Sequence, residues 1–334
     1  MSGYDDVAAR ARGLATHLLG PADWRALSDA ADLPTLAARL GQARESLHLR
    51  GPATAAGLER AVQRRAGQRL ALLGRWCAHR QELLDVIFGD EDRRSLRALV
   101  RGAAAAAPAE DRLAGTLPTP ALPLRALEML AAQPSIAAMA TLLVVWRHPA
   151  ASALEGAPRR GPADLLLLEV ALTREFAGRA VAAARHGDAL LRFYVHTLLD
   201  RENALTALAL ADAPAEIGLS ALFVEGGSIS LVALERVARA RPRLAALQEA
   251  QGAFRDTVLK DAFTEVEPSR LEEHLAQVHR QQVHRASRAE PLGSAPVLDY
   301  ALRLREEVQH FQRLAWALVL EAPIDERLGE DYRS

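Results

Sequence analysis

One arrangement of residues recurs three times along the chain. In each copy, an acidic residue is followed three positions later by a small or polar residue and then by an apolar run. The three stretches are GDEDRRSLRALVRGAAA, LLDRENALTALALADAP and LREEVQHFQRLAWALVLEAP. The three acidic residues, Asp92, Asp200 and Glu307, lie 108 and 107 residues apart. A near-constant period is hard to obtain by chance, so it predicts three diverged copies of one structural unit.

The composition indicates that these copies are helical. Half of the residues are hydrophobic but only 4% are aromatic, so the core must be built from Ala, Leu and Val. Strong helix formers fill almost every stretch, and strand formers are scarce. Apolar residues three and four apart run through 189–211 and 297–320, which predicts long helices there. The predicted fold class is therefore all-α.

Asp200 and Asn203 are unusual inside the apolar stretch that contains them. Asp and Asn are mediocre helix formers because their side chains compete for backbone hydrogen bonds. Residues three apart share one face of a helix, so the two side chains can bond each other or a common partner. We expect both on the interior side of a long helix, hydrogen-bonded to a polar group beside it.

Charge and cysteine content exclude several classes of protein. The chain has 41 Lys and Arg against 42 Asp and Glu, without the basic excess typical of nucleic-acid proteins. Its one cysteine, Cys77, cannot form an internal disulfide, and we interpret it as a small buried apolar residue. The amino terminus has no signal-peptide pattern, and the longest apolar runs, at 136–146 and 165–172, are shorter than the roughly 20 residues of a spanning helix. We expect a soluble cytoplasmic protein with no transmembrane segment and no nucleic-acid partner.

The sequence contains no catalytic or metal-binding pattern with suitable spacing. His274, His279 and His284 are five residues apart, which turns successive side chains by about 140° around a helix, so they cannot share one site. Gly226 and Gly227 lack the residues of a phosphate-binding loop and are better explained by a turn that needs positive φ. No nucleophile motif is present. The sequence therefore predicts no catalytic residue, no cofactor and no metal.

The segment 190–228 resembles the C-subunit family of the prokaryotic V/A-type rotary ATPases, whose counterpart in the eukaryotic vacuolar enzyme is the d subunit. That family carries an aspartate and an asparagine three apart on a long central helix, and two glycines some twenty residues further on. Asp200, Asn203, Gly226 and Gly227 match this motif. They are accordingly interpreted as structural motif residues of the family.

The resemblance extends to both ends of the chain. YDDVAARARGL is similar to the amino-terminal pattern of the family, and PLGSAPVLDYALRLREEVQHFQRLAWAL is similar to its carboxy-terminal helix pair. Glu307 and Arg313 are the motif residues in this last stretch. The chain departs from the family at two positions: Ala204 replaces the usual Leu, and His310 stands where a second asparagine is usual.

The resemblance implies a funnel of three similar helical subdomains around a pseudo-threefold axis. We expect repeats at 1–108, 109–214 and 215–334, with the first completed by the carboxy-terminal helices. It also implies a non-catalytic rotor component that lies on the cytoplasmic face of the membrane. Such a component would form a socket between the central-stalk subunits and the membrane proteolipid ring, and so couple ATP turnover to the transport of protons or other ions.

Two other classes of function stay open at this point. A helical-repeat adaptor would present a concave surface to a protein partner, but such proteins show many repeats of about 30–45 residues rather than three long ones. An enzyme would need a pocket assembled from scattered Arg, His and Glu residues. Neither class explains the long period as directly as a rotor component does.

Overall fold

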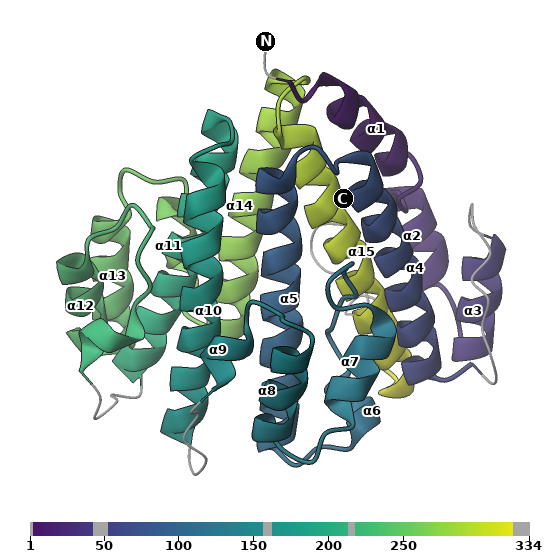
Figure 1. Cartoon of the computed structure of the whole chain (residues 1–334), viewed down its shortest axis with the longest axis horizontal. Coiled ribbons are helices and arrows are strands. Elements are labelled where there is room, and N and C mark those ends of the chain that lie inside the picture. The colour runs from purple at the N-terminus through teal and green to yellow at the C-terminus, as the bar shows by residue number, and fades with distance from the viewer. Residues whose placement is uncertain (1–2, 43–52, 156–161, 213–217, 323–334) are drawn as a thin grey trace.

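Long and short helices alternate along the computed structural model, which describes residues 3–42, 53–155, 162–212 and 218–322 (Figure 1). Within these ranges the chain forms fifteen α-helices and two short 3-10 helices, and no strand. The all-α prediction is therefore confirmed. No helix in the described ranges combines the length and apolar character needed to cross a membrane.

Six long helices form three consecutive pairs, and each pair is joined by a short turn. The pairs are α4 (Ala55–Trp76) with α5 (Gln81–Ala104), α10 (Pro162–Ala184) with α11 (Ala189–Asp212), and α14 (Pro268–Ala289) with α15 (Ala295–Val319). The second helices of the pairs begin 108 and 106 residues apart. Asp92, Asp200 and Glu307 lie on these three second helices.

Shorter helices fill the intervals between the long pairs. They are α1 (Asp5–Ala15), α2 (Pro21–Ser28), α3 (Leu33–Gln42), α6 (Ala109–Arg112), α7 (Leu124–Ala131), α8 (Ile136–Val145), α9 (Ala151–Leu154), α12 (Leu231–Arg239) and α13 (Arg243–Ala253), with 3-10 helices η1 (Leu219–Leu222) and η2 (Lys260–Thr264). Several begin at a side-chain cap: the Ser135 and Ser230 hydroxyls accept from the backbone N–H three residues later. Such caps satisfy backbone donors that the first helical turn leaves unpaired.

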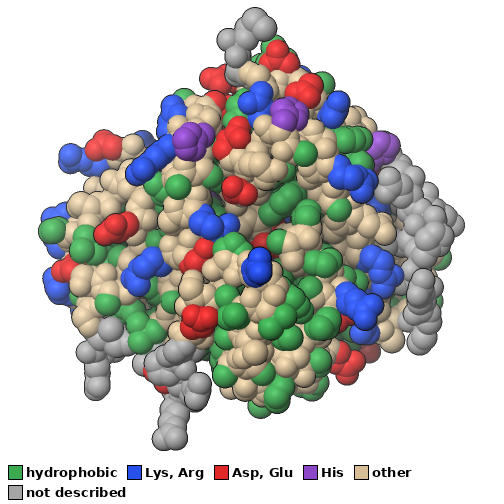
Figure 2. Space-filling view, viewed as in Figure 1, with side chains coloured by type: hydrophobic (Ala, Val, Ile, Leu, Met, Phe, Trp, Pro, Cys, Tyr) green, Lys and Arg blue, Asp and Glu red, His purple; other side chains and the backbone are tan. Residues whose placement is uncertain are grey.

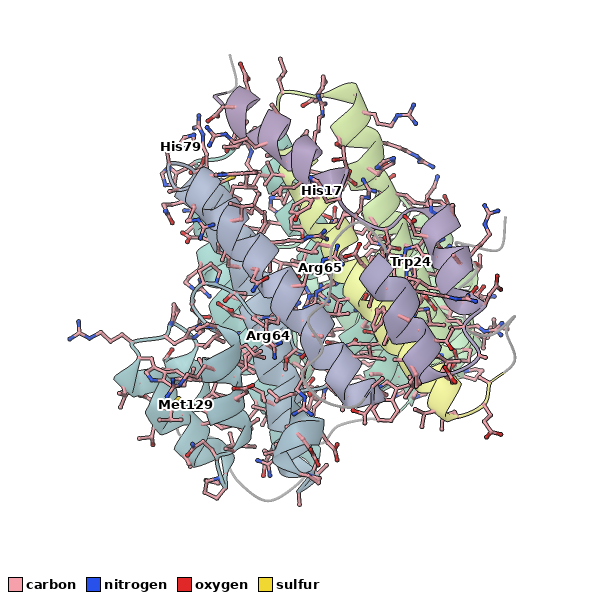
Figure 3. All side chains as sticks on the ribbon, turned by 90° about the vertical axis from the view of Figure 1, so that its right-hand side faces the viewer. His17, Trp24, Arg64, Arg65, His79 and Met129 are labelled. Carbon is pink, nitrogen blue, oxygen red and sulfur yellow. The ribbon has the colours of Figure 1, made fainter. Side chains whose placement is uncertain are left out.

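The first and last described helices meet in space. Helix α15 packs against α1, α3, α4 and α14, so the first and last described helices lie together (Figure 1). Figure 3 shows α15 behind α4, beside the α2 helix that carries Trp24. The Trp24 ring packs edge-on against His310 of α15, with ring centroids 5.5 Å apart.

Two apolar cores hold the helices together. The larger runs through the long pairs and contains Cys77, which is fully buried as predicted. The smaller lies where α7, α8 and α9 cover α5 and α10, with Leu99, Leu127 and Leu143 at its centre. The small side chains of Ala and Val let these helices approach closely, which is why so few aromatic residues suffice.

Candidate functional site

Asp200 and Asn203 hold one loop against α11. Both side chains are almost fully buried, with 2% and 3% of their surface exposed. The Asn203 amide donates to the Val224 carbonyl at 2.8 Å, and its oxygen accepts from the Val224 N–H at 2.9 Å. Asp200 accepts from the backbone N–H groups of Ser228 and Ile229 and from the Ser228 hydroxyl. We name this group, Asp200, Asn203 and residues 224–229, the α11 clamp.

The two glycines lie inside the loop that the α11 clamp holds. Gly226 has φ +105°, and a Cβ there would come within 2.6 Å of Val181 and 2.9 Å of Leu199. A Cβ on Gly227 would overlap the Asp200 carboxylate. Only glycine lets the backbone approach α11 this closely, which explains why the two glycines follow the polar pair in the sequence.

Asp92 and Ser95 hold the loop that follows α5 in a similar way. The Ser95 hydroxyl donates to the Leu117 carbonyl at 3.3 Å and accepts from the Leu117 N–H at 3.0 Å. Asp92 accepts from the Thr119 hydroxyl at 2.5 Å. Leu117 lies 22 residues after Ser95, and Thr119 lies 27 residues after Asp92. In the α11 clamp, Val224 similarly lies 21 residues after Asn203, and Ser228 lies 28 residues after Asp200. We name Asp92, Ser95 and residues 117–119 the α5 clamp.

A cavity of about 590 Å³ lies next to the α5 clamp. Its walls come from α4, α5, α10 and the loops at 120–121 and 148–149. The Nδ1 of His148 accepts from the Ala150 N–H, so its Nε2 donates to Asp92 at 3.3 Å. Both carboxylate oxygens of Asp92 are thereby bonded within the protein. This arrangement orients the loop that carries Thr119.

The third recurrence connects the two ends of the described chain. Glu307 accepts from the Leu19 N–H at 2.7 Å and pairs with Arg69 at 3.1 Å, and all three groups are largely buried. Glu307 therefore fixes the turn before α2 to α15. Arg313 instead lies at the surface, where it pairs with Glu273 at 2.9 Å. An exposed pair of this kind contributes little to stability.

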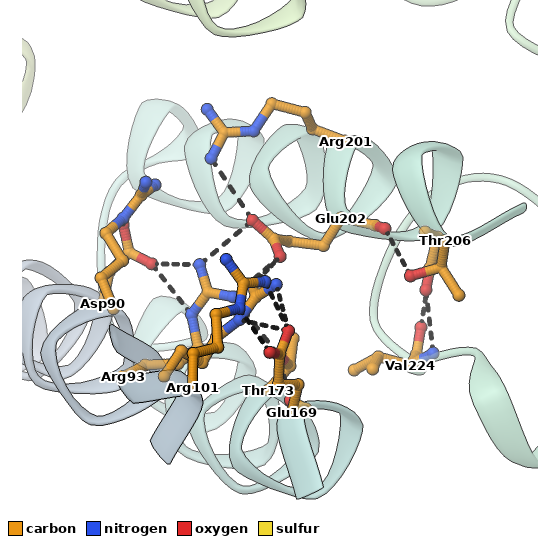
Figure 4. Close-up of polar contacts among 12 residues, drawn as sticks. Asp90, Arg93, Arg101, Glu169, Thr173, Arg201, Glu202, Thr206 and Val224 are labelled. Atoms are coloured by element: carbon orange, nitrogen blue, oxygen red, sulfur yellow. Dashed lines mark hydrogen bonds and ion pairs between the residues drawn. The ribbon is translucent and has the colours of Figure 1, made fainter. Parts of the chain in front are cut away.

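An ionic network lies between α5, α10 and α11 (Figure 4). Its side chains are joined by ion pairs of 2.5–3.5 Å. The members are Asp90, Arg93, Arg94, Arg97 and Arg101 of α5, Glu169 of α10, and Arg201 and Glu202 of α11. The network thus connects the first and second long pairs through charged groups that are mostly buried.

The acids of the ionic network are held ionised. Burial raises the pKa of Asp90, but the guanidinium groups of Arg94 and Arg93 outweigh it and bring the pKa below its usual value. Burial likewise opposes the ionisation of Glu202, yet Arg93 and Arg97 hold its pKa well below the usual range. Breaking one partner of such a buried pair leaves an uncompensated charge, so removing Asp90 or Glu202 alone is expected to destabilise the fold.

The histidines do not gather into one site. His279 is buried against the Tyr194 ring at 4.9 Å, and His284 lies 3.2 Å from Asp299. Across the described ranges, no group of three or more His, Cys, Asp or Glu side chains is arranged to hold a metal ion.

The sequence patterns did not predict the ionic network. Its signal was present in GDEDRRSLRALVRG, where Asp90, Arg93, Arg94, Arg97 and Arg101 follow each other by three, one, three and four residues. This spacing places all five on one face of a helix, opposite the apolar residues. A charged face is usually solvated, so only the packing of α10 and α11 over it revealed a buried network.

The exposed surface carries apolar side chains on helices α7 and α8. Met129, Val144 and Val145 expose 42%, 46% and 69% of their surface. Helix α8 contains no charged residue. Figure 2 shows hydrophobic side chains gathered over this part of the molecule. Exposed apolar groups of this kind often mark a contact with another protein.

A protein-family model described as "ATP synthase (C/AC39) subunit" matches residues 7–317. The matched range contains both clamps, the ionic network and Glu307. Among curated proteins, none matches the chain.

Proposed function

The chain belongs to the C/AC39 family of V/A-type ATP synthase subunits, and we propose that it is the central-rotor socket of such a complex. In this role it joins the central shaft, turned by ATP hydrolysis in the soluble head, to the ring of membrane proteolipids that moves ions. The socket itself carries no catalytic residue, cofactor or metal, and it lies against the cytoplasmic side of the membrane. The family match over residues 7–317 is the observation that carries this proposal.

The recurring helix order supports a threefold arrangement within the socket. Each long pair would form one wall of a funnel, related to the next by about a third of a turn around a common axis. The α5 clamp and the α11 clamp would then be equivalent, because each joins the second long helix of a pair to the loop that follows it. Glu307 would provide the corresponding contact for α15, with Leu19 from the other end of the chain.

The predicted repeat boundaries at 108/109 and 214/215 stay a prediction. The clamps suggest units shifted along the chain, since Asp92 bonds Thr119 and Asn203 bonds Val224 across those boundaries. Units that begin at α4, α10 and α14 keep each polar pair with its loop. In this division the third unit is completed by α2 and α3.

Torque transmission needs a stiff body rather than reactive groups. The clamps fix loops to long helices, and the ionic network ties α5 to α10 and α11. Directional bonds of this kind resist sliding of one helix along another better than apolar contacts alone, because they are specific in geometry. The apolar patch on α7 and α8 offers a surface to a neighbouring protein of the complex.

The proposal predicts uncoupling when the socket is lost. Deleting the gene, or ending the chain before Pro291, removes α15 and its contacts with α1, α3, α4 and α14. The detached head should keep some ATP hydrolysis, while ATP-driven ion pumping in membrane vesicles should disappear. Both activities are measured on the same membranes before and after washing, to separate bound from released heads.

Re-expression of the full-length chain serves as the control and should restore pumping. Normal pumping in vesicles that verifiably lack the protein would contradict the socket, and would favour the helical-repeat adaptor instead.

A further inference from the structure

The cavity beside the α5 clamp has the size and the walls of a small-molecule binding site. Its volume of about 590 Å³ lies within the range of about 300–1,000 Å³ that such sites occupy. Most of the residues around it have no polar side-chain atom, as is usual for these sites. They include Ala71, Ala78, Leu84, Phe88, Pro120 and Ala121.

One wall of the cavity is built around Phe88. A Cβ at Gly74 of α4 would come within 3.2 Å of the Phe88 ring and within 3.6 Å of Pro120. The absence of a side chain at Gly74 therefore lets the ring lie against α4. Phe88 is nevertheless only partly buried, and it lines the cavity. An apolar group of a ligand can pack against this wall and lose its contact with water.

Two side chains of opposite charge border another part of the cavity. Asp85 and Gly89 are four residues apart on α5, so their side-chain positions lie about 5–6 Å from each other on one face of the helix. The Nη1 of Arg179, from α10, lies 3.5 Å from the place that a Cβ on Gly89 would take. All three residues line the cavity. The Asp85 carboxylate and the Arg179 guanidinium therefore border the same region of it.

Both of these groups have polar atoms that the protein leaves unused. Asp85 makes no hydrogen bond or ion pair with the described residues. Arg179 bonds Glu175 through Nε and Nη2, at 2.6 and 3.2 Å, which leaves Nη1 without a partner in the described ranges. Arg75 of α4 lines the cavity as a second guanidinium, is exposed, and is likewise unpaired in the part of the chain that the structure describes. The cavity thus presents a free carboxylate acceptor and free guanidinium donors.

We propose that this cavity binds a free amino acid with a large apolar side chain. The ammonium group of the ligand donates to the Asp85 carboxylate, and the ligand carboxylate accepts from Nη1 of Arg179. The apolar side chain of the ligand packs against Phe88. A ligand with one charge satisfies only one of the two charged groups, and a small amino acid leaves the apolar wall uncovered. The presence of both signs of charge beside an apolar wall selects this class of ligand.

The ligand enters from the solvent side of the cavity. Arg75, Gln81 and Asp85 are exposed, whereas Leu84 and Gly89 are buried. Helices α4 and α5 belong to the first long pair and α10 to the second, so a bound amino acid contacts both pairs. This binding activity goes beyond the proposed function, because it requires no other subunit.

Calorimetric titration of the isolated full-length chain with L-phenylalanine tests the site. We expect saturable binding of one molecule per chain. Three matched compounds each lack one feature: phenylacetate lacks the ammonium group, phenethylamine lacks the carboxylate, and alanine lacks the aromatic ring. Each should bind at least about tenfold more weakly, the effect of losing one charge-assisted hydrogen bond or the burial of the ring.

Asp85→Asn removes the charged acceptor for the ammonium group. This variant should bind phenylalanine about tenfold more weakly. Its affinity for phenylacetate should be unchanged or higher, because phenylacetate has no ammonium group and is repelled by the Asp85 carboxylate. Asp256→Asn is the matched control, since the Asp256 side chain is 87% exposed and does not line the cavity. It should bind phenylalanine as the wild type does.

Ala71→Leu tests the location of the site independently of charge. Ala71 lines the cavity, so the added side chain takes up space that the ligand needs and should weaken phenylalanine binding at least about tenfold. Unfolding temperature and helix content are measured first for both variants. If Ala71→Leu does not fold, Asp85→Asn decides, because Asp85 is exposed and has no bond to lose.

Absence of saturable phenylalanine binding by the wild-type chain would overturn the proposal. Equal affinity of the wild type and Asp85→Asn for phenylalanine would also overturn it, as would phenylacetate or phenethylamine binding as tightly as phenylalanine. None of these results bears on the socket, because the titration contains no other subunit. Failure of the wild-type chain to enter any rotary complex would contradict the proposed function alone.

Discussion

The α5 clamp and the α11 clamp use the same two helix positions to hold different loops. In the α11 clamp, Asp200 meets backbone N–H groups directly, and Gly226 and Gly227 let the loop lie against the helix. In the α5 clamp, Asp92 meets the side chains of Thr119 and His148, and a cavity of about 590 Å³ lies beside them.

This difference separates what the helix supplies from what the loop supplies. The helix provides an acid and a second polar group three residues apart, and both clamps need this pair. The glycines are needed only where a carboxylate reaches the backbone itself, because a side chain would occupy the space of the hydrogen bonds. A threonine hydroxyl reaches further, so the loop of the α5 clamp can stand away from the helix.

The largest effect is expected from filling the close contact of the α11 clamp. Gly226→Ala adds a Cβ that overlaps Val181 and Leu199 in a backbone with φ +105°. We expect it to lower the free energy of unfolding by about 3 kcal/mol or more, from backbone strain together with overpacking. Urea unfolding measures this change.

Gly115→Ala is the matched control, since Gly115 has φ +74° but open space where its Cβ would lie. It should lose only about 1–2 kcal/mol, the cost of the backbone conformation. Equal losses in the two variants would mean that close packing contributes nothing to the α11 clamp.

The next effect concerns the amide of the α11 clamp. Asn203→Leu removes both bonds to Val224 and leaves its buried N–H and carbonyl unsatisfied. We expect a loss of about 1–3 kcal/mol. Ser95→Ala removes the corresponding bonds to Leu117, whose lengths are 3.0 and 3.3 Å, and should lose a comparable amount, about 1–3 kcal/mol. Wild-type thermal stability in Asn203→Leu would contradict the role of the amide.

A smaller effect is expected in how stability depends on pH, which should differ between the α11 clamp and the ionic network. Burial raises the pKa of Asp200 despite the hydrogen bonds from Ser228 and Ile229. The contribution of Asp200 to stability is therefore fully present at pH values below the pKa that it has in the unfolded chain. This contribution is lost as the pH rises through the higher pKa that Asp200 has in the folded protein. Asp90 behaves oppositely, because its pKa is lowered in the fold, so its contribution is lost as pH falls.

The two aspartates can be compared by urea unfolding at about pH 4 and about pH 7. The stability deficit of Asp200→Asn relative to wild type should shrink at the higher pH, whereas that of Asp90→Asn should grow. The same pH trend in both variants would show that the two carboxylates share one environment.

The smallest effect is expected at Arg313. Its ion pair with Glu273 is about half exposed on both sides. Arg313→Ala should change the free energy of unfolding by no more than about 0.5 kcal/mol, because water screens such pairs. A loss as large as that of Asn203→Leu would place Arg313 among the structural residues that the family resemblance suggested.

Much of the fold followed from local signals in the sequence. The apolar spacing at 189–211 and 297–320 predicted α11 and α15 to within two residues at either end. The turn that needs positive φ was predicted at the glycine pair and is present at Gly226. The ionic network was missed, because a charged helix face looks the same in sequence whether water or another helix covers it.

Taken alone, the sequence determined the helices and the face on which each polar pair lies, because helix propensity and the 3.6-residue period act over a few residues. Only the tertiary structure decided which partners those faces meet. Asn203 reaches a loop 21 residues away, while Arg93 and Arg101 reach acids 109 and 68 residues away. Such partners depend on how whole helices pack, and packing is set by the summed apolar contacts of the chain rather than by any local pattern.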